Sequence, residues 1–117
     1  PVPGHGKLAA DAKVDDAATY AAFVGSDYAP ARILEQALAF VRARREQPFF
    51  LYFPSPLPHL ALQVPEVDVR AYADRFAETP YRGEHGYTPH RTPRAAYAAM
   101  ITRLDHDVGA LLDLLDE

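Results

Sequence analysis

A run of five apolar residues at positions 49–53 (FFLYF) constrains the fold of this chain more than any other feature. The run is rich in aromatic residues and is bounded by Pro48 and Pro54, which is typical of a short strand buried on both faces. Such a strand needs neighbours, and a parallel neighbour requires a long crossover connection. The chain offers no second convincing strand, so we expect the rest of such a sheet to lie elsewhere.

Amphipathic helices are predicted on both sides of this run. Residues 27–46 place apolar side chains at helical spacing, with Pro30 in the first turn and arginines in the last. Residues 93–116 begin with Thr92 as an N-cap and Pro93 at the first helical position. The apolar stripe of this second helix consists of Tyr97, Met100, Leu104, Val108, Leu111 and Leu115. Helix, buried strand and helix in this order predict an α/β fold.

The other stretches are predicted to be irregular. Residues 1–26 hold small and charged residues with no sustained period, so we interpret them as a connecting segment. Four prolines stiffen the first part of a loop over residues 54–92, and residues 66–76 have the composition of a short helix within it. We therefore expect residues 27–117 to form a partial α/β domain.

Composition excludes several classes of function. The formal net charge is −4, so the chain lacks the cationic field that attracts nucleic acids. It contains no cysteine, which excludes disulfides, thiolate metal sites and a cysteine nucleophile within it. No apolar run has the length of a membrane span. We expect neither a nucleic-acid nor a membrane partner.

His59 is the main candidate for chemistry. It lies in the loop PSPLPH directly after the predicted strand, and ligands of open α/β sheets bind beyond the carboxyl ends of strands. An imidazole there can donate a hydrogen bond to an anionic oxygen or a proton to a departing alkoxide. The alternative is a histidine in a solvent-exposed loop.

Other polar residues have weaker assignments. Arg82 and Arg91 either line the entrance of an anion-binding site or belong to a solvated loop. We interpret Asp105 as a structural hydrogen-bond acceptor near the apolar stripe, and Arg103 with Asp107 as an ion pair on the outer helix face. The remaining histidines are interpreted as exposed polar residues and not as a metal site, because their spacing does not suit zinc: His5, His85, His90 and His106.

Three elements in the same order resemble those of the sulfatase family. The string PFFLYFPSPLPHLALQVP at residues 48–65 is similar to the family's apolar strand, short loop and Pro-His pair. Residues 28–41 are similar to the helix before that strand, and residues 93–115 to the helix after it. The chain thus resembles the central part of an arylsulfatase-like protein of the alkaline phosphatase superfamily.

This resemblance implies a three-layer α/β domain that hydrolyses sulfate esters with a calcium ion and a formylglycine made from cysteine. It implies that His59 contacts the sulfate or the leaving-group oxygen. The family's Cys-x-Pro-x-Arg motif, its early aspartate pair and its Lys-x-His motif have no counterpart here. Its Asp-Asn pair is expected just past Glu117. The resemblance therefore implies that this chain contributes an active-site histidine, holds no metal and is inactive alone.

Two alternatives stay open. One is a phosphate or phosphonate ester hydrolase of the same superfamily, which the missing nucleophile alone would distinguish. The other is a non-catalytic partner-binding module that docks through the helix at residues 93–115. The apolar faces of the predicted elements also suggest self-association of the chain.

Overall fold

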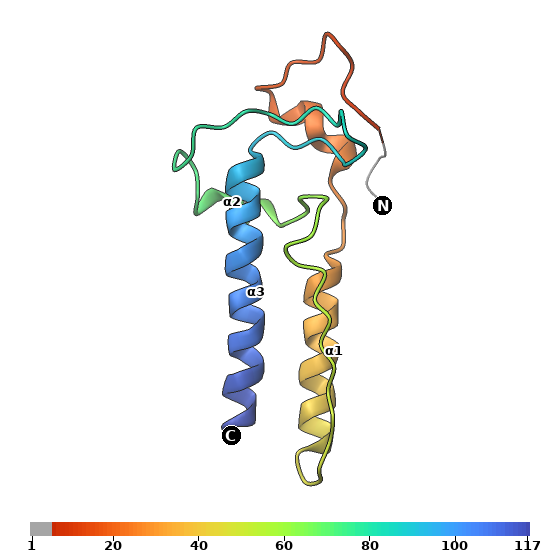
Figure 1. The fold of residues 1–117 in the computed structure, drawn as a ribbon, viewed down its shortest axis with the longest axis vertical. Helices are drawn as coiled ribbons and strands as arrows, with labels where there is room; N and C mark the ends of the chain where they lie inside the picture. Colours follow the sequence, from red (N-terminus) through yellow and green to blue (C-terminus); the bar gives the residue numbers. More distant parts are fainter. Residues whose placement is uncertain (1–5) are drawn as a thin grey trace.

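The computed structural model describes residues 6–117, so His5 and the start of the predicted connecting segment lie outside the described residues. Its elements are the 3₁₀ helix η1 (Ala17–Phe23) and the α-helices α1 (Ala29–Arg44), α2 (Glu66–Arg70) and α3 (Pro93–Leu115). The long helices α1 and α3 lie side by side, and most of the loops gather at one end of the pair, while the turn after α1 lies at the other end (Figure 1). None of these helices has the length and hydropathy of a membrane span.

Helix α1 lies within the helix predicted at residues 27–46 and ends at a cluster of arginines. Pro30 lies in its first turn, where its missing N–H leaves no hydrogen bond unmade. Arg42 and Arg44 lie in its last turn, where their positive charges interact favourably with the negative end of the helix dipole. Ala37 and Val41 are buried. Helix α1 therefore presents a narrow apolar face, and much of its remaining surface is exposed.

Residues 49–53 form no strand in the described part of the chain, in contrast to the doubly buried strand that the sequence predicts. The segment returns along α1 in an extended path (Figure 1). Phe49 packs edge-to-face on Phe40 of α1, with 5.7 Å between ring centroids. A strand needs a hydrogen-bonding neighbour, and residues 6–117 supply none to this segment. Phe50 consequently stays 86% exposed.

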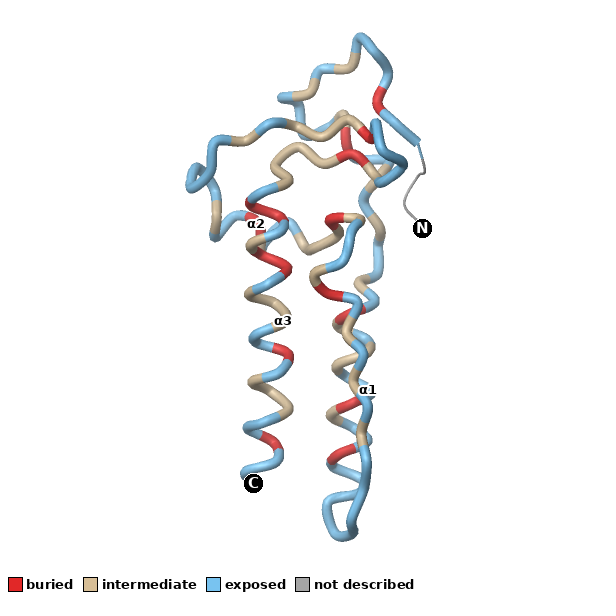
Figure 2. Tube along the Cα trace, viewed as in Figure 1, coloured by how far each residue is buried: buried red, intermediate tan, exposed pale blue. Residues whose placement is uncertain are grey.

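The core lies where α2, α3 and the His59 loop meet. Its buried apolar residues are Leu57, Leu62, Val69, Ala95, Ala96, Ala99 and Met100. Buried positions on α1 and α3 lie along the sides that face each other (Figure 2). The radius of gyration is 16.9 Å, compared with about 13 Å for a compact domain of this length. The chain is therefore more open than a domain with a full core.

The buried face of α3 differs from the predicted apolar stripe. Met100 is buried, but Tyr97, Val108 and Leu115 are exposed. The buried positions instead include three alanines in the first two turns and Asp107 further along. Small side chains let α2 and the His59 loop approach the helix closely, so the contact face is rotated away from the largest apolar residues.

A distant carboxylate caps the start of α3. Thr92 is the N-cap residue, but its side chain makes no capping hydrogen bond. Glu78 accepts from the backbone N–H of Arg94 at 3.1 Å and from that of Ala95 at 2.7 Å. These are donors that the helix itself leaves unsatisfied, and a negative charge is favourable at this end of the helix. The predicted cap position is right, but a different residue supplies the capping atoms.

We expect Glu78→Ala to lower the free energy of unfolding by about 0.5–2 kcal/mol, because two N–H groups of α3 lose their acceptor. Urea denaturation followed by circular dichroism measures the change. Glu46→Ala is the matched control, since that side chain is 91% exposed and forms an ion pair with its sequence neighbour Arg45. Equal effects of the two substitutions would contradict the capping role.

Candidate functional site

Turns and buried anchors fix the loop that carries His59. The backbone N–H of His59 donates to the carbonyl of Pro56 at 2.8 Å. The N–H of Leu57 donates to the hydroxyl oxygen of Ser55 at 3.2 Å. Leu57 and Leu62 are both buried in the core cluster, so the loop is anchored on each side of the histidine. Pro54, Pro56 and Pro58 fix φ at three positions before His59 and limit the conformations that the loop can adopt.

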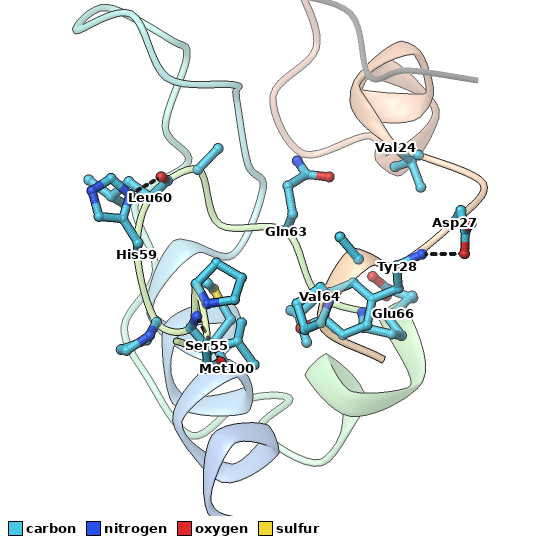
Figure 3. A pocket seen from close by; sticks show the side chains of 18 of the residues that line it. Val24, Asp27, Tyr28, Ser55, His59, Leu60, Gln63, Val64, Glu66 and Met100 are labelled. Carbon is cyan, nitrogen blue, oxygen red and sulfur yellow. Dashed lines mark hydrogen bonds between the residues drawn. The ribbon is translucent and has the colours of Figure 1, made fainter. Parts of the chain in front are cut away.

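One ring nitrogen of His59 contacts a backbone carbonyl oxygen, and the other has no hydrogen-bond partner within the described residues. Its Nδ1 lies within hydrogen-bonding distance of the carbonyl oxygen of Leu60 (Figure 3). A carbonyl oxygen only accepts, so Nδ1 carries the hydrogen. In the neutral ring Nε2 then holds a lone pair, and in the protonated ring it becomes a second donor. The residue is exposed, which leaves Nε2 accessible to a ligand.

A cavity of about 1040 Å³ borders this loop. It lies between the His59 loop and residues 24–30 at the start of α1, and Met100 of α3 forms part of its wall (Figure 3). Gln63 lines the cavity, and its amide nitrogen donates to the carbonyl of Phe23 at 3.3 Å and the hydroxyl of Thr88 at 3.2 Å. The lining includes Asp27 and Glu66 but neither lysine nor arginine. Among the described residues that line the cavity, His59 is therefore the only one whose side chain can carry a positive charge.

Arg82 and Arg91 lie apart from this cavity. The guanidinium of Arg82 donates to the carbonyl of Ala9 and, at 3.1 Å, to that of Ala10. Burial raises the pKa of the Tyr20 phenol, and the charges of Arg82 and Arg91 partly oppose that rise. Both arginines thus lie near η1, and the structure does not bring them together with His59. Their role at a substrate entrance stays a prediction.

The family comparison adds to this geometry. A model of the Sulfatase family matches residues 6–117, which is nearly the whole chain. The chain belongs to the sulfatase family. Membership implies an α/β fold and a lineage of sulfate ester hydrolases. No curated protein matches the chain.

Formylglycine would require a cysteine, and calcium would require clustered oxygen ligands. Formylglycine is made from cysteine, and the sequence has none. Over residues 6–117, no three histidine, aspartate or glutamate side chains gather as metal ligands. His85 and His106 are exposed, as predicted. His90 is half-buried, and burial lowers its pKa.

A charged cluster in the described part of this sulfatase-family chain extends beyond the Arg103–Asp107 pair that the sequence predicts. Arg103 on α3 contacts Asp68 of α2 at 3.2 Å and Asp107 at 3.5 Å. Its guanidinium carbon lies 5.4 Å from the ring centroid of Tyr28, at the start of α1. Asp107 is only 2% exposed, so this pair faces the interior and the predicted outer-face location is wrong. Asp105, predicted to be a structural acceptor near the apolar stripe, is exposed.

Two atoms near this cluster are buried without a hydrogen-bond partner in the described part of the chain. They are Oδ2 of Asp107 and the hydroxyl oxygen of Tyr28. Burial raises the pKa of Asp107, while the charge of Arg103 opposes the rise. Burial also raises the pKa of Tyr28 to about 12. The cluster therefore holds a carboxylate whose ionised form is disfavoured by folding.

This shift gives a stability prediction with a definite sign. A pKa raised by folding means that the carboxyl group of Asp107 favours the folded state when protonated, and that this contribution is lost as pH rises through the folded pKa. The side-chain amide of asparagine cannot ionise. We therefore expect the free energy of unfolding of Asp107→Asn, relative to the unmodified chain, to increase as pH rises from acid to neutral.

Urea denaturation at a series of pH values measures this difference. Asp105→Asn is the matched control, because its exposed carboxylate lies two residues away on the same helix. Its difference from the unmodified chain is expected to change little with pH. A difference for Asp107→Asn that falls as pH rises would show that ionised Asp107 stabilises the fold.

Proposed function

We propose that this chain supplies the histidine of a sulfate ester hydrolase site within a three-layer α/β domain of the arylsulfatase type. One observation carries the proposal: the contact of Nδ1 with the Leu60 carbonyl leaves Nε2 of His59 free at the edge of a cavity. Membership of the sulfatase family supports sulfate esters as the substrate class.

The chemistry of the bond explains why a histidine is useful there. When the S–O bond of a sulfate ester breaks, negative charge builds on the leaving oxygen. A donor at that oxygen is bound more strongly in the transition state than in the ground state, which accelerates the reaction. Protonated His59 has one proton to give, at Nε2, because the Leu60 carbonyl retains the proton at Nδ1. Transfer of the Nε2 proton to the leaving oxygen returns the ring to its neutral form, with the hydrogen on Nδ1.

The chain alone lacks the other groups that this reaction needs. Among residues 6–117, the cavity is lined by two acidic residues and no lysine or arginine, so an anionic ester finds little electrostatic attraction there. We propose that the nucleophile, the calcium ligands and the cationic groups come from outside this chain. One oriented histidine without them does not supply the electrostatic stabilisation of the transition state.

Two alternatives share some of the observations. A phosphate or phosphonate ester would present the same leaving oxygen to His59. A non-catalytic binding module is favoured by the face of α3 that carries Tyr97 and Ile101, each 46% exposed. A binding module that docks through α3 does not need a free Nε2 on His59. A His59 substitution that changes the binding or hydrolysis of a sulfate ester would therefore favour the hydrolase site over the binding module.

We expect the purified chain to hydrolyse an aryl sulfate no faster than buffer does. The measurement is release of the phenol at high protein concentration, with and without added calcium. His59→Ala is the control, and His85→Ala is its matched partner because that histidine is exposed and does not line the cavity.

Turnover above the buffer rate that persists in His59→Ala would contradict both the proposed inactivity and the proposed role of this histidine. Turnover that disappears only in His59→Ala would support the role of His59 but overturn the requirement for groups outside the chain.

A further inference from the structure

The side chain of Gln63 joins three segments that lie far apart in the sequence. Its amide nitrogen carries two hydrogens. One is donated to the carbonyl of Phe23 at 3.3 Å, and the other to the hydroxyl of Thr88 at 3.2 Å. Phe23 is the last residue of η1, and Thr88 lies in the loop between α2 and α3. A single neutral amide therefore connects η1, the His59 loop and the loop before α3.

This link joins the two walls of the His59 cavity. Phe23 directly precedes residues 24–30, which form one wall, and Gln63 lines the other wall (Figure 3). Within residues 6–117, its bond to Phe23 is the only hydrogen bond between residues 17–30 and residues 54–66. Both walls also pack against the apolar core, through Tyr28 and Val64. Gln63 therefore supplies the one directional contact between the walls in the described part of the chain.

A short path leads from this contact to the imidazole. The backbone N–H of Gln63 donates to the carbonyl of Ala61 at 2.8 Å, which closes a three-residue turn. Ala61 directly follows Leu60, whose carbonyl contacts Nδ1 of His59. The turn thus couples the backbone at Gln63 to the carbonyl that orients the ring. A displacement of Gln63 would change the direction of that carbonyl.

We propose that Gln63 is a positioning residue for His59, which fixes the separation of the two cavity walls and keeps Nε2 of the ring free at the edge of the cavity. The inference rests on the proposed hydrolase function, since orientation of a reacting group helps a reaction by removing rotational freedom in advance. Glutamine suits this position because it donates two hydrogen bonds without adding charge to a cavity that already holds Asp27 and Glu66.

Two substitutions separate the hydrogen bonds of Gln63 from its size. Gln63→Leu removes both donors. Gln63→Glu has nearly the same size, but its ionised carboxylate at neutral pH can only accept a hydrogen bond. It therefore loses the bond to the Phe23 carbonyl and can keep one with the Thr88 hydroxyl. Gln36→Leu is the matched control, because Gln36 is exposed on α1 and does not line the cavity.

The test combines two measurements on the full chain. Because the sequence has no cysteine, Ala22→Cys and Val67→Cys provide two specific sites for nitroxide labels, and pulsed electron spin resonance then gives the distribution of distances between η1 and α2. Long-range ¹H–¹⁵N spectra locate the hydrogen on the neutral His59 ring. We expect both Gln63 variants to broaden the distance distribution and to shift the Nε2 resonance toward that of a protonated nitrogen. Gln36→Leu is expected to change neither.

Each other outcome counts against a stated part of the inference. If both Gln63 variants leave the distances and the ring spectrum unchanged, the inference is wrong and the proposed hydrolase site stands, because Nε2 is still free. Broader distances with an unchanged ring spectrum would overturn the positioning of His59. A shifted resonance with unchanged distances would overturn the role of the walls. A hydrogen on Nε2 in the unmodified chain would instead contradict the proposed function, and with it this role of Gln63.

Discussion

The ion pairs of Arg103 tie the helices of this chain together. This side chain reaches Asp68 on α2 and Asp107 one turn further along α3, and it covers the ring of Tyr28 at the start of α1. Both carboxylates are at least partly removed from solvent, so loss of the arginine would leave a buried charge without a partner. Contacts of one guanidinium thus support the relative placement of α1, α2 and α3, together with the apolar core between α2, α3 and the His59 loop.

The same cluster helps to shape the candidate site. Tyr28 lines the His59 cavity and lies under Arg103, while Met100 forms part of the cavity wall less than one turn before Arg103. The loop that carries His59 is anchored through Leu57 and Leu62 in the core that Met100 shares. The geometry around the free Nε2 therefore rests on contacts that are distant from the imidazole itself.

Local sequence patterns predicted part of this arrangement. Helical periodicity, Pro30 and Pro93 locate the long helices, because these signals depend on residues close in sequence. Apolar character and flanking prolines predict a strand at residues 49–53, but a strand also requires a neighbour, which the described residues do not supply. The location of the Arg103–Asp107 pair was predicted wrongly because Asp68, the other partner of Arg103, lies 35 residues away, and no local pattern links the two.

His59 is a candidate because of its place after an apolar run, and its role stays a prediction. Its ring orientation could not be predicted, since it depends on a contact with the carbonyl of Leu60. The same holds for Arg82, whose guanidinium bonds to carbonyls more than 70 residues away. Sequence patterns identify residue types suited to a reaction, while their hydrogen-bond partners decide what each nitrogen can do.

The tautomer of His59 tests the central claim most directly. Long-range ¹H–¹⁵N correlation spectra of the full chain, recorded at a pH where the imidazole is neutral, distinguish the two ring nitrogens. The account predicts that Nδ1 carries the hydrogen and that Nε2 has the chemical shift of an unprotonated nitrogen. A hydrogen on Nε2 would contradict it, because the Leu60 carbonyl would then not orient the ring and Nε2 would not be free.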